Sequence, residues 1–128
     1  MMKKIITTDQ APAAIGTYSQ AVRVDNTVYI SGQIPLDPTT MNIVKGEFRL
    51  HVQQVFKNLQ AVAIAAGGNL EDIVKLTIYL LDMQQFPIVN EVMAEFCQSP
   101  YPARAVIAVS ALPKGAVVEM DAVLYLPS

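Results

Sequence analysis

The fold of this chain is decided by HVQQVFKNLQAVAIAAGGNLEDIVKLTIYLL, residues 51–81, where a helical pattern is followed directly by a strand pattern. Apolar residues in the first half recur at the spacing of one helix face, and Gly67-Gly68 predicts the end of the helix. The second half, residues 72–81, is so rich in apolar residues that it predicts a strand buried on both faces. The apolar positions of the predicted helix are Val52, Val55, Phe56, Leu59, Val62, Ala63 and Ala66.

On the N-terminal side, residues 18–33 have the pattern of a β-hairpin. Alternating β-branched residues flank Asp25-Asn26, a pair that favours a turn. Residues 34–46 follow as a loop, because proline, threonine, asparagine and glycine interrupt every regular pattern there. A third strand before the first helix is left open.

On the C-terminal side, a second helix is expected after Asp82. Gln85 stands three residues beyond Asp82, as in a capping box, and Pro87 falls in the first turn. An apolar stripe then continues the helix, and two strands, about 104–109 and 117–125, finish the chain. The stripe consists of Phe86, Val89, Met93 and Phe96.

This order of elements predicts an α+β fold in which two helices cover one face of a single β-sheet. No repeat or linker divides the chain, so residues 1–128 are expected to form one domain. The uncovered sheet face should still carry Val, Ile and Leu, and such a face is usually buried between subunits. A homo-oligomer is therefore expected.

Composition narrows the function classes. The formal net charge is −2, hydrophobic residues make up 52% and charged residues 16% of the chain. This composition excludes intrinsic disorder and argues against a nucleic-acid-binding module, which would carry a basic patch. No apolar run approaches the length of a membrane span, and Lys3-Lys4 is followed by too few apolar residues for a signal peptide. We expect a cytoplasmic protein without membrane contact.

One cysteine, Cys97, and one histidine, His51, limit the chemistry further. An intramolecular disulfide cannot form. A structural zinc site needs about four Cys or His ligands and a catalytic one about three, so neither can be assembled unless subunits share ligands. We therefore predict no metal site, with acid–base chemistry assigned to carboxylates, tyrosine, lysine or a positioned water. Cys97 is expected as an apolar filler at a helix end and His51 at the surface or its boundary.

Two charged residues stand in apolar strands. Arg104 lies in the sequence ARAVIAV, so an anion should face it, either a structural carboxylate or the carboxylate of a substrate. Glu119 lies between Val118 and Met120 and is either a partner for Arg104 or Lys114 or a general acid/base. Asp121 alternates onto the same face as Glu119. On an edge strand both carboxylates would simply be solvated.

Weaker candidates are found in the predicted loops and in the second helix. Tyr18 follows a bend at Gly16-Thr17, and Ser31-Gly32 ends a strand where glycine permits close approach of a ligand. Asn90 stands among apolar helical positions, as an inter-helix hydrogen-bonding residue or as a site group.

Four collinear segments resemble the RidA family, also called YjgF or endoribonuclease L-PSP. The most specific is PARAVIAVSALPKGAVVEM, residues 102–120, with its Pro-Ala-Arg, a Leu eight residues later and a closing Val-Glu-Met. The resemblance implies the chorismate-mutase-like (YjgF-type) α+β fold, with a single mixed β-sheet, and a homotrimer with clefts between subunits. The other segments are APAAIGTYSQAV (11–22), YISGQIPLDPTT (29–40) and LLDMQQFPIVNEVMAEF (80–96).

The resemblance also implies an activity, the hydrolysis of reactive enamines and imines such as 2-aminoacrylate and 2-aminocrotonate to 2-keto acids and ammonia, without cofactor or metal. In this family's pattern Arg104 binds the substrate carboxylate and Glu119 positions the attacking water. The remaining cleft positions are Tyr18, Ser31, Gly32, Asn90 and Val106.

Two positions depart from the family's usual residues. Thr17 replaces a common proline beside Tyr18, and Val106 replaces a common cysteine, which excludes thiol catalysis at that position.

Two other functions compete with the imine deaminase. A non-catalytic trimer that binds 2-keto acids or other carboxylates would use the same Arg104 cleft. An endoribonuclease or translation inhibitor, as one family name suggests, fits less well, because the chain is acidic and has no basic cluster beyond Lys3-Lys4.

Overall fold

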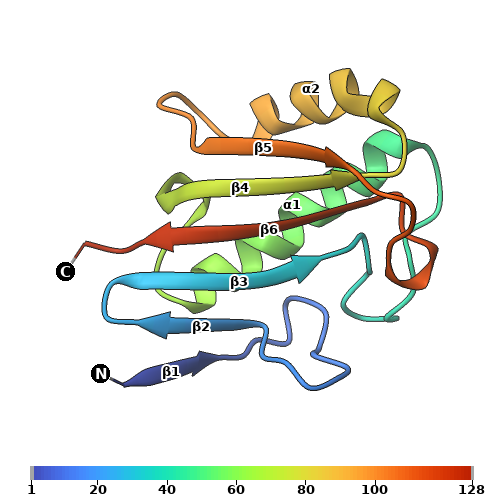
Figure 1. Ribbon diagram of the computed structural model, residues 1–128. Helices are drawn as coiled ribbons and strands as arrows, with labels where there is room; N and C mark the ends of the chain where they lie inside the picture. The colour runs from blue at the N-terminus through green and yellow to red at the C-terminus, as the bar shows by residue number, and fades with distance from the viewer. Residues whose placement is uncertain (1, 128) are drawn as a thin grey trace.

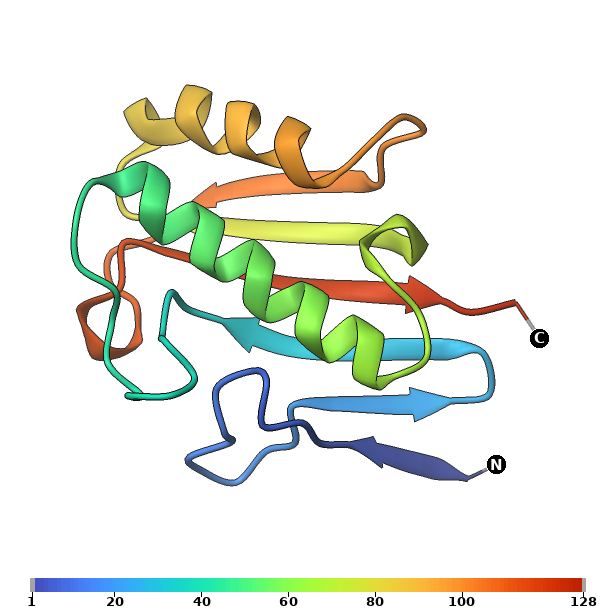
Figure 2. The same cartoon turned by 180° about the vertical axis from the view of Figure 1, so that it is seen from behind.

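One mixed β-sheet of six strands runs through the protein, and both α-helices lie on the same face of it (Figure 1). Figure 2 shows the covered face, with the helices in front of the strands. The computed structural model describes residues 2–127, so the ends of the predicted domain, residues 1 and 128, lie outside the described part. The strands are β1 (Lys3–Ile6), β2 (Ala21–Val24), β3 (Thr27–Gln33), β4 (Ile73–Leu80), β5 (Ala103–Ala108) and β6 (Val118–Tyr125), and the helices are α1 (Phe48–Ala65) and α2 (Phe86–Phe96).

The strand order is β1-β2-β3-β6-β4-β5, and β4 and β5 are the parallel pair among antiparallel neighbours. The predicted α+β class is confirmed, and β1 is the third N-terminal strand that the sequence left open. The last strand, β6, lies in the middle of the sheet. Glu119 and Asp121 are therefore on a central strand, and the alternative of two solvated edge carboxylates is wrong.

Helix α1 follows the predicted periodicity closely. Its expected apolar stripe packs onto the sheet, with six of the seven positions at 0% exposure and Ala66 at 5%. The helix ends where Gly67 adopts a φ of +100°, in the left-handed region that glycine occupies without strain. The ring of Phe56 stacks on Phe96 of α2 with 5.2 Å between centroids, which joins the two helices above the sheet.

Helix α2 begins differently from the prediction. Asp82 accepts a hydrogen bond from the Gln84 backbone N–H at 2.9 Å and starts a short 3-10 turn, Met83–Gln85, rather than a capping box with Gln85. The α-helix proper then starts at Phe86 with Pro87 in its first turn. The Asp82 cap thus acts one turn before the helix that it was expected to cap.

Strand β4 is covered on one face of the sheet alone, so the prediction of burial on both faces is wrong for the single chain. Leu76, Ile78 and Leu80 are fully buried beneath the helices. The opposite side chains, Thr77 and Tyr79, are half-buried. A run of apolar residues does not reveal which face has a partner, and here the second face has none within residues 2–127.

The uncovered sheet face is also less aliphatic than predicted. Tyr29 is 54% exposed, Tyr125 is 51% exposed and Ile107 is 43% exposed, and two carboxylates lie among them on β6. Aromatic rings with a polar end suit an interface between subunits as well as contact with water. Within residues 2–127, no helix has the length and apolar content needed to cross a membrane.

Candidate active site

A cavity of about 380 Å³ opens beside Glu119 at one end of the sheet. It brings together four residues singled out in the sequence, Tyr18, Ser31, Gly32 and Glu119. The remaining lining is mostly apolar, with Lys114 as the cation on its rim. A carboxyl group is thus placed in a largely apolar pocket that can hold a small molecule.

A β-bulge makes the room for Glu119. The pairing of β3 with β6 shifts register between Ile30 and Gln33, so Ser31 and Gly32 stand at an irregular place in the ladder. A Cβ atom at Gly32 would lie 2.1 Å from Oε2 of Glu119. The absence of a side chain at Gly32 therefore leaves the room that the Glu119 carboxylate occupies in this arrangement.

Buried Gln20 fixes the loop that carries Tyr18. Its side-chain oxygen accepts a hydrogen bond from the Thr8 N–H at 2.7 Å, and its amide nitrogen donates to the carbonyls of Thr8 at 3.0 Å and Pro12 at 2.7 Å. Ser31 ties the same loop to β3, because its hydroxyl donates to the Ser19 carbonyl at 2.6 Å. Tyr18 itself is 50% exposed, and its hydroxyl accepts a long hydrogen bond from the Ile15 N–H at 3.5 Å.

Burial and charge make Glu119 a weaker acid than a free glutamate. Burial raises its pKa first, and the nearby carboxylate of Asp121 raises the pKa further. Such a carboxyl group holds a proton closer to neutral pH, which suits a group that both accepts and returns protons.

Arg104 lies elsewhere, on the edge strand β5, in a cradle formed by α2. Its Nη1 donates to Oδ1 of Asn90 at 2.8 Å and lies 3.5 Å from Sδ of Met93. The guanidinium carbon lies 5.0 Å from the centroid of the Phe86 ring. These supports orient the guanidinium without neutralising it, because each of them is uncharged.

One expectation for Arg104, a structural ion pair, is corrected. The side chain is exposed, because β5 is an edge strand. Among residues 2–127, Arg104 forms no ion pair with a carboxylate, so the structural pair with Glu119 is wrong, and Lys114 does not pair with Glu119 either. The positive charge of Arg104 therefore remains available to an anion.

Arg104 and Glu119 cannot meet within one chain. Arg104 is in register with Leu76, whose side chain is buried under the helices, so both lie on the helix face. Glu119 is in register with Tyr79, three residues further along β4 and hence on the opposite face. The structure therefore contains two separate half-sites.

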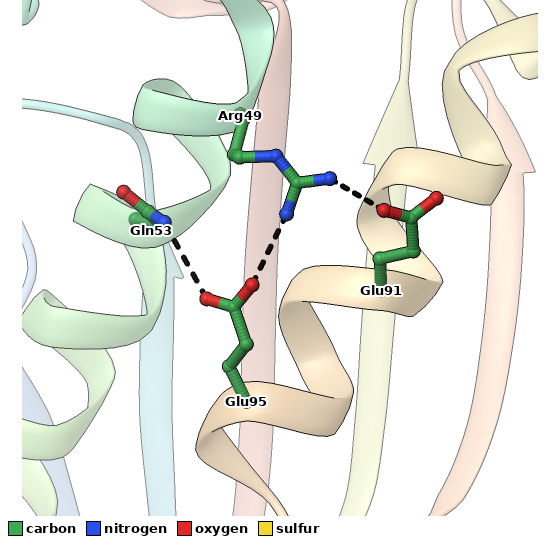
Figure 3. A network of polar contacts seen from close by, with 4 residues as sticks. All are labelled: Arg49, Gln53, Glu91 and Glu95. Atoms are coloured by element: carbon green, nitrogen blue, oxygen red, sulfur yellow. Dashed lines mark hydrogen bonds and ion pairs between the residues drawn. The ribbon is translucent and has the colours of Figure 1, made fainter.

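An ion-pair network holds α2, and with it Asn90, against α1. Figure 3 shows Arg49 of α1 between Glu91 and Glu95 of α2, with Gln53 also reaching Glu95. The Arg49 Nη1 to Glu95 Oε2 distance is 3.1 Å. Because Glu91 adjoins Asn90 in sequence, this network fixes the helix that supports Arg104.

Cys97 and His51 line neither the Glu119 cavity nor the Arg104 cradle, whereas Val106 lies two residues beyond Arg104 on the same face of β5. Cys97 is 5% exposed at the end of α2, and burial raises the pKa of its thiol, as expected of an apolar filler. His51 is half-buried and its Nε2 lies 3.2 Å from the Gly46 carbonyl oxygen. Val106 packs against the hydrophobic core from β5. Residues 2–127 contain no cluster of three or more His, Cys, Asp and Glu side chains that could hold a metal ion.

Sequence reasoning missed several residues of the two half-sites. Phe86 and Met93 were assigned to the core stripe of α2, yet with Asn90 they fall at the i, i+4 and i+7 spacing that places three side chains beside Arg104. The tether from Gln20 had no sequence signal, since its partners are backbone groups 8 to 12 residues away.

The fold and the half-sites define a class, a small α+β protein with a partly buried carboxyl group in one cavity and a separate guanidinium that has no ion pair among residues 2–127. Comparisons with known proteins agree with this class. A family model described as "Endoribonuclease L-PSP" matches residues 8–126. The chain therefore belongs to the endoribonuclease L-PSP family, the RidA family that its sequence resembles.

Individual relatives are similar over nearly their whole length. A protein of Dermatophagoides farinae named 2-iminobutanoate/2-iminopropanoate deaminase is 47% identical over 124 residues, 97% of each chain. The crystal structure of RidA from an Antarctic Psychrobacter is 53% identical with a TM-score of 0.93, covering 96% of this chain and 99% of that one. Escherichia coli TdcF, whose structure has bound serine, is 36% identical with a TM-score of 0.90, covering 97% and 99% of the chains.

Proposed function

We propose that this protein hydrolyses 2-imino acids and their enamine tautomers, such as 2-aminoacrylate and 2-aminocrotonate, to 2-keto acids and ammonia. The observation that carries the proposal is the guanidinium of Arg104, oriented by Asn90 and Phe86 and left without a carboxylate partner within residues 2–127. A planar guanidinium binds a carboxylate through two charge-assisted hydrogen bonds. Relatives at 44–47% identity bear the name of this deaminase.

The reaction needs a second group near the bound substrate. Water adds to the electrophilic imine carbon and loses a proton, the nitrogen gains protons, and the C–N bond breaks to release ammonia and the 2-keto acid. Glu119 has the position and the raised pKa for this proton transfer in its cavity. Arg104 holds the carboxylate, and Tyr18, Ser31 and Gly32 shape the wall.

Because the two half-sites lie on opposite sheet faces, a complete site requires a second subunit. We assign the protein to a homotrimer in which Arg104 of one subunit faces the Glu119 cavity of the next. The exposed Tyr29, Ile107 and Tyr125 on the uncovered face supply the contact surface. Sedimentation equilibrium should give three times the chain mass, and a 13.9 kDa species at micromolar concentration would contradict the trimer.

The activity test generates the imine in situ with a pyridoxal-phosphate-dependent threonine dehydratase and follows keto-acid release above the uncatalysed background. Wild type should accelerate release, whereas Arg104→Lys and Arg104→Ala should fall to background. Lysine retains the charge but lacks the planar fork, and losing such a contact reduces the catalysed rate roughly 30- to 1,000-fold.

The matched control is Lys57→Gln, which removes one positive charge from the exposed side of α1 and should leave the rate unchanged. Wild-type acceleration by a folded Arg104→Ala protein would show that the arginine does not bind substrate.

A second candidate function, carboxylate binding without catalysis, is favoured by one observation, the serine bound to TdcF. It uses the same two half-sites. If wild type binds 2-ketobutyrate in a titration while imine hydrolysis stays at background, this second function replaces the first.

A further inference from the structure

Three ionisable side chains lie close together on the uncovered sheet face, next to the cavity. Glu119 and Asp121 are two residues apart on β6, and side chains at that spacing point to the same face. Tyr79 of β4 is directly opposite Glu119 in the register, and Thr77 is opposite Asp121. The hydroxyl of Tyr79 reaches diagonally to Asp121 and donates a hydrogen bond to Oδ2 at 2.9 Å.

This hydrogen bond keeps Tyr79 as the donor and holds the Asp121 side chain in place. The hydrogen bond to Asp121, followed by burial, raises the pKa of Tyr79, so the phenol keeps its proton. The Asp121 carboxyl group is thus held on the same sheet face as Glu119, two residues away along β6.

The groups around this pair of carboxylates come from four directions. From the loops, Tyr18 and the exposed ammonium of Lys114 line the cavity. From β3, Ser31 and Gly32 bring no charge. From β4, Tyr79 directs its hydroxyl to Asp121, and Lys75 is in register with Val123 on the same face without an ion pair to either carboxylate among residues 2–127. Within the single chain, burial and Asp121 raise the pKa of Glu119, and in the proposed trimer Arg104 of the next subunit adds a positive charge on the open side of the cavity.

We propose that Asp121 and Tyr79 are positioning residues for proton transfer at Glu119, with the Tyr79 hydroxyl holding the Asp121 carboxylate on the same sheet face as Glu119, two residues along β6. The inference rests on the proposed role of Glu119 and deepens it, since it names the groups that regulate its protonation. Proton affinity nearer to neutral makes Glu119 a better base toward the attacking water and a better acid toward the departing nitrogen.

The test measures protonation directly, without activity. The chain has five glutamates, so ¹³C labelling at glutamate Cδ gives five titrating signals, and the one that Glu119→Gln removes belongs to Glu119. In Asp121→Asn, which preserves shape and an oxygen acceptor for Tyr79, the Glu119 midpoint should fall, because the charge of Asp121 is removed. Glu71→Gln removes the same charge before the start of β4 and should leave the midpoint unchanged. An unchanged midpoint in Asp121→Asn would overturn the proposal.

A second variant tests Tyr79 and remains decisive if Asp121→Asn does not fold. In Tyr79→Phe, the Glu119 midpoint should also fall, because the Asp121 carboxylate is no longer held beside Glu119 by a hydrogen bond. An unchanged midpoint would remove Tyr79 from the proposal.

The pH profile of the catalysed rate links this pair to the reaction. In Asp121→Asn the acid limb of the pH profile should move to lower pH. The kcat/KM of this variant divided by that of wild type should therefore change below neutral pH, whereas a merely structural defect lowers this ratio equally at all pH values. If wild type hydrolyses imines but the Glu119 midpoint does not respond to Asp121→Asn, this inference fails and the proposed function stands. If the midpoint responds but no imine is hydrolysed, the proposed function fails instead.

Discussion

Replacing Gly32 by alanine tests whether the position of the Glu119 carboxylate determines activity. The new Cβ would lie 2.1 Å from Oε2 and 3.0 Å from Cδ of Glu119, so the carboxylate must withdraw by more than about 1 Å. The φ of Gly32 lies outside the left-handed region, so alanine can adopt the backbone conformation without strain. The disturbance therefore falls on the end of one flexible side chain.

The expected effects on stability and on rate differ sharply. Moving Glu119 to another rotamer should lower the free energy of unfolding by about 0.5–1.5 kcal/mol. A catalytic group displaced by about 1 Å reduces the rate on the order of 100-fold. The coupled imine assay and urea denaturation measure the two quantities on the same protein.

Gly16→Ala is the matched control for Gly32→Ala. Its Cβ would lie 3.5 Å from Cε1 of Tyr18, an ordinary van der Waals distance, and Gly16 also lies outside the left-handed region. This variant should retain wild-type rate and stability. If folded Gly32→Ala hydrolyses imines at the wild-type rate, the reasoning that places Glu119 in the chemistry is refuted.

Two further predictions concern the thiol and the core. Treatment with a thiol-alkylating reagent should leave deamination intact, because Cys97 is 5% exposed, its raised pKa disfavours the thiolate, and it lies outside both half-sites. Mass spectrometry measures the alkylation and the coupled assay measures the activity. Lost activity in an alkylated protein that is still assembled would contradict this prediction. Leu76→Ala should lower the free energy of unfolding by about 2–5 kcal/mol, because it leaves a cavity at a fully buried position between β4 and the helices. Urea denaturation measures this loss, and a loss below about 1 kcal/mol would show that the core packs differently.

Local patterns in the sequence predicted the elements of the fold well. The stripe from Val52 to Ala66 repeats at helical spacing and packs as expected, and the turn at Asp25-Asn26 joins β2 to β3. The place of β6 between β3 and β4 could not be predicted, because strand pairing depends on contacts between segments far apart in the chain. For the same reason, the apolar run of β4 did not show that one of its faces is uncovered.

The candidate site was predictable residue by residue but not as an arrangement. Arg104 and Glu119 stood out because each is a charge in an apolar strand, and Gly32 because it ends a strand. Their separation onto opposite faces follows from the register of β4 with both neighbours, which no local pattern contains. The hydrogen bond from Tyr79 to Asp121 depends on the same register.

A mixing experiment tests most directly the central claim, that Arg104 and Glu119 of different subunits form one imine-hydrolysing site. Arg104→Ala and Glu119→Gln proteins, each at background alone, are unfolded together in equal amounts and refolded, with mixed trimers verified by native mass spectrometry. A cleft is intact when its arginine comes from a Glu119→Gln subunit and its glutamate from an Arg104→Ala subunit. In an equal mixture each of these two choices occurs in half of the cases, so about one quarter of wild-type activity should return. Wild type refolded with the double variant Arg104→Ala/Glu119→Gln gives the same fraction of intact clefts and serves as the positive control. Background activity in the verified mixed trimers, with the control active, would contradict the shared site.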